Sequence, residues 1–216
     1  MCIPVNSTVQ ETGNFMLKLW KDRITMDNRS LLDFMAIAEK LKCNTRHSWT
    51  SSGRHESVAE HTYRLCVFAW LVKDDMTREF PECDMDKVMK MCLFHDLGEA
   101  VTGDVPCFEK KKTDSAKEAK AIEHAARLLP AAQQEELLSL IKELDMNATS
   151  EAKIVHALDK MEALIQHNEA SIDTWLPLEY ELQITYGQEQ AQFSSYLRSL
   201  RKTVEQDSVD KIEEGN

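Results

Sequence analysis

The 216-residue sequence lacks any run of the roughly 20 apolar residues that a membrane-spanning helix needs. Near the N-terminus, charges at Lys18, Lys21, Asp22 and Arg23 interrupt the apolar stretch, so we expect neither a signal peptide nor membrane association. It also lacks internal repeats and any sustained alternation of polar and apolar residues. With 43% hydrophobic and 29% charged residues, it has the composition of a soluble globular protein.

Cysteine pairs of the C-x-x-C type are absent as well. The six cysteines are scattered at Cys2, Cys43, Cys66, Cys83, Cys92 and Cys107. Cys66 and Cys92 fall within apolar helical patterns, which is typical of reduced thiols that fill a core. The spacing argues against a zinc–thiolate site and favours a cytoplasmic protein.

Basic residues are in short supply: 26 Lys and Arg stand against 37 Asp and Glu, giving a net charge of -11. This balance argues against an extended nucleic-acid polymer as partner, because such partners select basic surfaces. A single nucleotide remains possible, since a small anion needs only a local cationic pocket.

Helical periodicity is the dominant pattern, and it predicts one all-α domain over residues 1–216 with roughly seven or eight helices and a core over about 30–190. Apolar faces recur within 31–41, 61–72, 88–97, 121–129, 133–144, 152–165 and 188–204. The acidic segment 205–216 is expected to be a disordered tail.

The stretch around which the chain is organised runs from Met91 to Ala100, where an adjacent His95 and Asp96 close an apolar run. Buried charge is costly unless it is paired or bound to a metal, so this pair needs a partner. Glu99 follows one turn later on what we expect to be the same helix. Asp104 then falls in a turn, just beyond the stop signals that end that helix.

Two further polar residues lie on predicted core-facing stripes. His61 heads a helix that opens with the capping-box pattern of Ser57 and Glu60, and Asp159 interrupts the apolar face that contains Val155. Taken alone, His61 could be a hydrogen-bonded core histidine and Asp159 could pair with a core Arg or Lys. With His95 and Asp96 they instead make a set of two imidazoles and two carboxylates. Such a set suits one divalent ion, such as Mn²⁺, Co²⁺, Fe²⁺ or Zn²⁺, with positions left open for water and a phosphate oxygen.

The segment 45–56 has the Ser, Thr and Gly content of a loop, but it also gathers Arg46, His47, Trp49 and Arg54 in an acidic protein. It could be a solvated connector. It could also be an anion-binding lip, with Arg to bind phosphate and Trp to cover a ring or sugar.

With these motifs the chain resembles the HD-domain phosphohydrolases, whose signature is H…HD…D. The resemblance covers roughly residues 30–190 and is carried by ESVAEHTYR at 56–64, HDLGEAVTGDVP at 95–106 and ALDK at 157–160. It extends to the subgroup containing the bacterial 5′-deoxynucleotidases and their eukaryotic relatives. It implies a helical fold that is often dimeric, with one divalent ion on His61, His95, Asp96 and Asp159.

The resemblance also implies site roles and a nucleotide substrate. Glu99 matches the catalytic carboxylate near the attacking water, Arg46 matches the phosphate-orienting arginine, and Asp96 serves both as ligand and as part of the catalytic set. Substrate contacts are expected from Arg46, His47, Trp49 and Asp104. His47 departs from family members that carry Trp directly after the arginine, which bears on selection against ribonucleotides.

Three alternatives remain open from the sequence. A dinuclear phosphodiesterase would add histidine ligands, for which the chain offers His124 and His156. An alarmone hydrolase would place Asp where Ala100 stands. A non-catalytic nucleotide-binding protein could keep the ligands, but it would have no need for Glu99.

Overall fold

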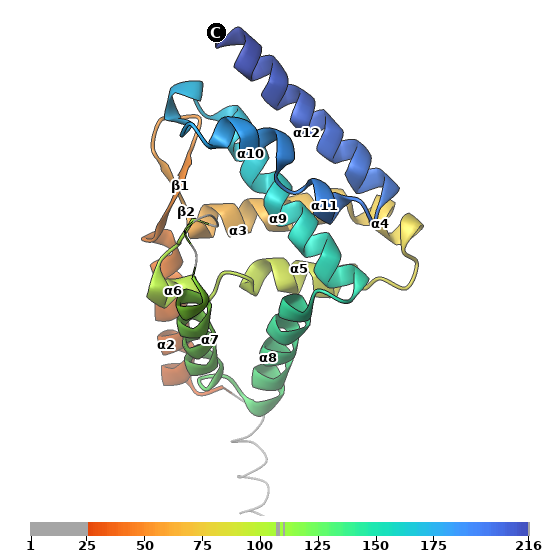
Figure 1. Ribbon diagram of the computed structural model, residues 1–216. Coiled ribbons are helices and arrows are strands. Elements are labelled where there is room, and N and C mark those ends of the chain that lie inside the picture. Colours follow the sequence, from red (N-terminus) through yellow and green to blue (C-terminus); the bar gives the residue numbers. More distant parts are fainter. Residues whose placement is uncertain (1–25, 107–108, 110, 216) are drawn as a thin grey trace, which may run out of the picture.

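Helices make up nearly all of the regular structure in the computed structural model, which describes residues 26–106, 109 and 111–215 (Figure 1). The elements are α2 (Asn28–Glu39), η1 (Lys40–Lys42), β1 (Thr45–Trp49), β2 (His55–Ser57), α3 (Val58–Leu71), α4 (Lys73–Glu79), α5 (Met85–Phe94), α6 (Glu99–Thr102), α7 (Lys112–Ala126), α8 (Ala131–Met146), α9 (Ser150–Glu169), η2 (Ile172–Thr174), α10 (Glu179–Thr185), α11 (Gln188–Ala191) and α12 (Ser195–Glu214). The predicted all-α class is confirmed. Within the described residues, the helices of ten or more residues are α2, α3, α5, α7, α8, α9 and α12, close to the predicted number.

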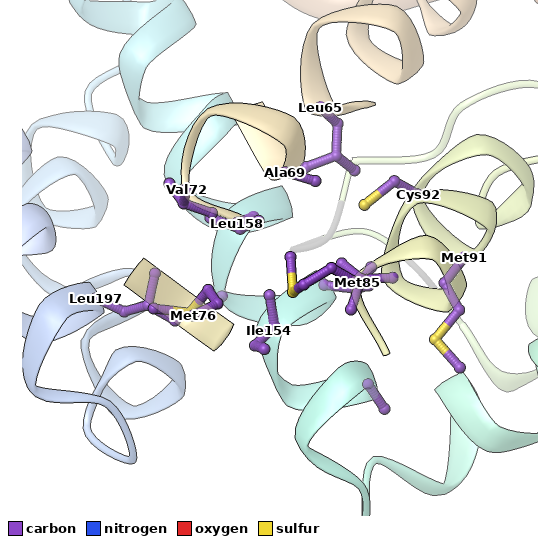
Figure 2. Close-up of a cluster of buried hydrophobic side chains, with 14 of the residues drawn as sticks. Leu65, Ala69, Val72, Met76, Met85, Met91, Cys92, Ile154, Leu158 and Leu197 are labelled. Carbon is purple, nitrogen blue, oxygen red and sulfur yellow. The ribbon is translucent and has the colours of Figure 1, made fainter. Parts of the chain in front are cut away.

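The main core lies where α3, α5 and α9 pack on one another, with α12 along the outer side of α9 (Figure 1). Leu65 and Ala69 of α3, Met91 and Cys92 of α5 and Leu158 of α9 belong to one cluster and are all fully buried (Figure 2). Burying an aliphatic side chain of this size contributes about 1.5–3 kcal/mol. His61 lies on α3, Asp159 lies on α9 and His95 directly follows α5, so the core fixes the separations of the candidate ligands.

A second apolar cluster joins α6, α7 and α8 to the end of α2. It includes Ala100, Ile122 and Leu137, together with Leu97 of the turn between α5 and α6.

Local capping starts the main helices. Ser57 and Glu60 form the expected capping box, so α3 begins at Val58 and His61 lies in its first turn. The side chain of Asp84 caps α5, and that of Thr149 caps α9.

The predicted loop 45–56 is instead a short antiparallel hairpin. Strands β1 and β2 pair with Thr45 opposite Ser57 and Trp49 opposite His55, with an irregularity between them. Gly53 turns the chain with a φ of 79°, a value that favours glycine. The strands are too short for alternation to be visible in the sequence.

The expected continuous helix through His95 and Glu99 is also wrong. Helix α5 ends at Phe94, and residues 95–98 form turns closed by hydrogen bonds such as Leu97 N–H to Phe94 O at 3.1 Å. At Gly98 a Cβ would lie 2.8 Å from Glu118 Cβ and 3.0 Å from Glu118 Cα, so only glycine allows α7 this close. The break gives His95 and Glu99 different directions from those of a straight helix.

The C-terminal segment is ordered rather than disordered, and the predicted helix 188–204 is divided into α11 and α12. Helix α12 continues to Glu214 because its inner face remains buried past Val204. The hydroxyl of Ser208 donates to Asn168 Oδ1 at 2.8 Å, and Asn168 Nδ2 donates to Val204 O at 3.1 Å. The acidic residues of 205–214 occupy the outer face. The composition of this segment therefore resembles that of a disordered tail, although the segment is helical.

The described cysteines Cys43, Cys66, Cys83 and Cys92 are free thiols, and Cys92 is buried as expected. Cys2 and Cys107 lie outside the described residues. Among the residues described, no helix combines the length and the apolar character that crossing a membrane requires.

Candidate metal centre and substrate cavity

The structure brings the four expected ligands together from three separate elements. His95 Nε2 lies 3.0 Å from Asp96 Oδ2, and His61 Nε2 lies 3.1 Å from Asp159 Oδ1. The remaining imidazole–carboxylate separations are 3.8 and 3.9 Å. Metal–ligand bonds of about 2.1 Å place neighbouring donors roughly 3–3.5 Å apart. The donors of His61, His95 and Asp96 all lie within 4.8 Å of one another, and Asp159 adds an oxygen near both imidazoles, so the set suits one ion.

Hydrogen bonds set both imidazoles in the orientation that a metal ligand needs. His95 Nδ1 donates to the Cys92 carbonyl at 2.8 Å, and His61 Nδ1 donates to the carboxylate of Glu162. Each Nε2 therefore faces the centre of the cluster. His95 Nε2 is buried and makes no well-directed hydrogen bond within the described residues. Carboxylate- or carbonyl-bound histidines of this kind are the usual ligands of protein metal sites.

The electrostatics of the cluster also suit a cation. Burial raises the pKa of Asp96, but neighbouring His95 outweighs it and holds that pKa at about 2. Burial likewise opposes ionisation of Asp159, yet the hydrogen bond from His61 lowers its pKa below the usual value. Burial and Arg46 lower the pKa of His61, whereas Asp159 and Glu162 raise it, with a net value of about 10. Protons on the imidazoles thus offset the charge of the ionised carboxylates, and a metal ion can displace such protons from its ligands.

Arg46 lies beside this cluster on β1. Its Nε is 3.4 Å from Glu56 Oε2 and its Nη1 is 3.7 Å from Asp96 Oδ2. Burial raises the pKa of Glu56 to about 7. The guanidinium therefore lies between acidic neighbours, and Arg46 lines the adjoining cavity.

A cavity opens beside the four ligands. Its lining includes Arg46, His47, Asp96, Glu99, Asp104, Val105, Pro106, Asp159, Lys160, Ala163, His167, Glu179, Leu182, Gln183 and Tyr186. Every expected catalytic and substrate-contacting residue but Trp49 is in this set. Trp49 lies outside the lining, with its ring centred 4.1 Å from that of His55. Arg54 is exposed and paired with Glu60 at 2.5 Å.

Several lining or supporting residues were not anticipated. Glu162 lies three positions after Asp159 on α9, and that spacing on a core-facing stripe is a signal that could have found it. Lys160 stacks its Nζ 4.4 Å from the Tyr186 ring centre. His167 and Glu179 come from regions where the sequence shows no motif.

The histidines of the dinuclear alternative do not join the ligand cluster. His124 is exposed on α7. His156 donates from Nε2 to the Leu144 carbonyl at 3.0 Å and lines a neighbouring cavity.

The chain is similar to known proteins over most of its length. The model of the HD domain matches residues 38–201. The chain is 32% identical over 145 residues to human 5′-deoxynucleotidase HDDC2, covering 65% of this chain and 68% of the human protein. It is 29% identical over 145 residues to the Schizosaccharomyces pombe 5′-deoxynucleotidase hdd1, covering 63% and 70%.

Solved structures agree as well. A Magnetospirillum magnetotacticum protein described as a predicted metal-dependent phosphohydrolase superposes with a TM-score of 0.73 at 22% identity, over 87% of this chain and 97% of that one. A conserved hypothetical protein of Pyrococcus furiosus gives a TM-score of 0.64 at 28% identity, over 82% and 98%. The likeness to the Magnetospirillum protein speaks for the fold alone.

Proposed function

Because the chain belongs to the HD-domain family, we propose that it is a metal-dependent phosphohydrolase that converts deoxynucleoside 5′-monophosphates to deoxynucleosides and phosphate. The observation that carries the proposal is the position of Glu99 and Arg46, which line one cavity together with Asp96 and Asp159. A protein that only bound nucleotides would need the ligands but not a carboxylate beside them.

His61, His95, Asp96 and Asp159 would hold one divalent ion, whose chemical contribution is Lewis acidity toward a phosphate oxygen and a bound water. Glu99 is 5% exposed, and from this position it accepts the proton of the attacking water as general base. Arg46 binds the phosphate through its guanidinium fork, which suits a terminal monoester. Asp104, past the glycine turn that ends α6, accepts a hydrogen bond from a sugar hydroxyl.

Sugar selection belongs to His47 in this proposal. Its Nε2 is held 2.9 Å from Glu179 Oε1, so the ring is fixed on the cavity wall and can crowd a 2′-hydroxyl. Trp49 takes no part, because it lies away from the cavity.

The decisive measurement compares kcat/KM for deoxy- and ribonucleoside 5′-monophosphates, 3′-monophosphates and a simple phosphodiester, with Mn²⁺ or Co²⁺ added. We expect the deoxynucleoside 5′-monophosphates to be preferred. Preference for the 3′-monophosphates or the diester would contradict the proposal. Equal rates on deoxy and ribo forms would remove only the role of His47.

A variant series separates binding from chemistry. Glu99→Gln should keep its metal and lose about 10²–10⁴-fold in kcat, because it removes the base and not a ligand. Asp96→Ala should lose both the metal and activity. The matched control is Glu123→Gln, an exposed glutamate of α7 that should behave as wild type. Full activity in Glu99→Gln would show that another group is the base.

We also propose that the protein is a cytoplasmic homodimer. Helix α3 presents an outer stripe of large apolar side chains, with Tyr63 72% and Trp70 61% exposed. A second copy could cover such a stripe, and the free thiols agree with a reducing compartment. Sedimentation should give the mass of two chains, and Trp70→Arg should give one; a wild-type monomer would exclude the dimer. Fractionation of expressing cells tests the compartment.

A further inference from the structure

Three side chains on the cavity wall form a second cluster of metal-binding type. They are His47 from β1, His167 near the end of α9 and Glu179 at the start of α10. His47 Nε2 lies 2.9 Å and His167 Nε2 3.8 Å from the same oxygen, Glu179 Oε1, and the three donor atoms all lie within 4.8 Å of one another. Glu179 and His167 are buried, and all three residues line the cavity described above.

The geometry of this cluster repeats that of the first centre. The His47 and His167 rings are 5.4 Å apart, against 5.3 Å for His61 and His95. The imidazole–carboxylate separations cover the same range in both clusters. Two histidines with one glutamate are the ligands of many zinc sites that keep a fourth position open.

The ligand atoms are also prepared for a cation. The Leu176 N–H donates to Glu179 Oε2 at 2.6 Å and leaves Oε1 directed at the two rings. The Ser48 hydroxyl, 3.2 Å from His167 Nε2, would give way to the ion.

We propose that His47, His167 and Glu179 form a second metal site that takes a zinc-class divalent ion. It is separate from the first centre. Asp159 and His167 lie eight residues apart on α9, about 12 Å along the helix axis, and the two clusters share no residue.

Charge explains why the cavity needs a second ion. Its wall carries the five carboxylates of Asp96, Asp104, Asp159, Glu99 and Glu179 but only two permanently cationic side chains, Arg46 and Lys160. One divalent ion leaves the wall net negative, which opposes a phosphate dianion. A second ion makes it net positive. This charge argument rests on the proposed phosphate substrate, whereas the ligand geometry does not.

The test counts metal ions in the full chain. Wild-type protein is equilibrated with zinc, dialysed and analysed for zinc per chain by mass spectrometry. We expect two ions in the wild type and one in each of His167→Ala, Glu179→Gln and His95→Ala. His124→Ala removes an exposed histidine outside both clusters and should keep two. Circular dichroism checks the fold of each variant, and His47→Ala replaces any that fails to fold, because its side chain is 29% exposed and contributes less to packing.

Cobalt supplies a second readout, since its visible spectrum reports ligand number. Titration of the wild type should show two spectral components, of which His167→Ala loses one and His95→Ala the other. One ion in the wild type, or a second ion that survives both His167→Ala and Glu179→Gln, would overturn the proposal. Nucleotide hydrolysis with one ion would leave the proposed function standing without the second site. Two bound ions without hydrolysis of any nucleotide would support the second metal site and contradict the proposed function.

Discussion

Glu162 shows how a single residue outside the ligand set controls it. The side chain is 1% exposed and accepts the Nδ1 proton of His61, while its other oxygen lies 3.6 Å from Arg64 Nε. Glu162→Gln removes the charge that makes Nε2 a strong ligand. We expect metal affinity to fall about 10–100-fold, measured by competition with a chelating indicator.

Glu169→Gln is the matched control for that change. Glu169 is also on α9 and also pairs with Arg64, at 2.6 Å, but it does not contact His61. The metal affinity of Glu169→Gln should equal that of the wild type. An equal fall in both variants would assign the effect to Arg64 rather than to His61.

At the level of single residues, the sequence predicted those whose polarity conflicts with an apolar pattern. The four candidate ligands interrupt apolar stripes that the sequence predicts to be buried, namely His61, His95, Asp96 and Asp159. Because burying a polar or charged group costs free energy, such residues can be recognised as candidates for a functional site. Glu179 and His167 could not be found this way. Their partners come from distant elements, and no local pattern records that β1 passes beside α9 and α10.

Among the elements, the start of α3 determines where His61 lies. The Glu60 N–H is 3.2 Å from Ser57 Oγ, and the Ser57 N–H donates to Glu60 Oε2 at 2.8 Å. Ser57→Ala should lower the free energy of unfolding by about 1 kcal/mol, measured in urea at neutral pH. Ser199→Ala, at an exposed site within α12, should change it by less than about 0.5 kcal/mol. Equal effects would mean that the cap does not stabilise α3.

The same cap gives a pH dependence with a defined sign. The hydrogen bond from Arg54 lowers the pKa of Glu60 to about 2, below its ordinary value near 4.5. A depressed carboxyl pKa contributes stability that is present above the unfolded value and is lost as pH falls through the folded one. Part of the loss of stability between about pH 4.5 and pH 2 should therefore disappear in Glu60→Gln.

Elements were predictable where helical period and capping agree, as in α3, α5 and α9. The hairpin β1–β2 was missed because short strands show no period. The break at 95–98 was missed because the apolar pattern runs through it, and the close approach of Glu118 to Gly98 involves a residue twenty positions away. Helix α12 was missed beyond Val204 because one buried serine and one valine do not offset an acidic composition.

For the whole molecule, we expect metal binding to raise the free energy of unfolding, because the ion binds the folded chain and not the unfolded one. Binding at 100 times Kd adds about 2.7 kcal/mol of stability. For a chain of this size that corresponds to a fall of roughly 5–10 °C in Tm when a chelator removes the metal. A thermal scan with and without chelator measures it, and the fall should be smaller in His95→Ala. An unchanged Tm after stripping, verified by elemental analysis, would argue against a bound ion.

Helix α9 carries Asp159, Glu162 and His167 as one rigid body. Each residue of a helix is rotated about 100° from the one before it. A one-residue insertion between Asp159 and His167 would therefore turn the two ends out of register and separate a ligand from its orienting carboxylate or from the cavity. No substitution elsewhere could restore both. Homologous chains should therefore have no insertions or deletions in this segment. Insertions and deletions should occur instead in the connections that precede and follow α9.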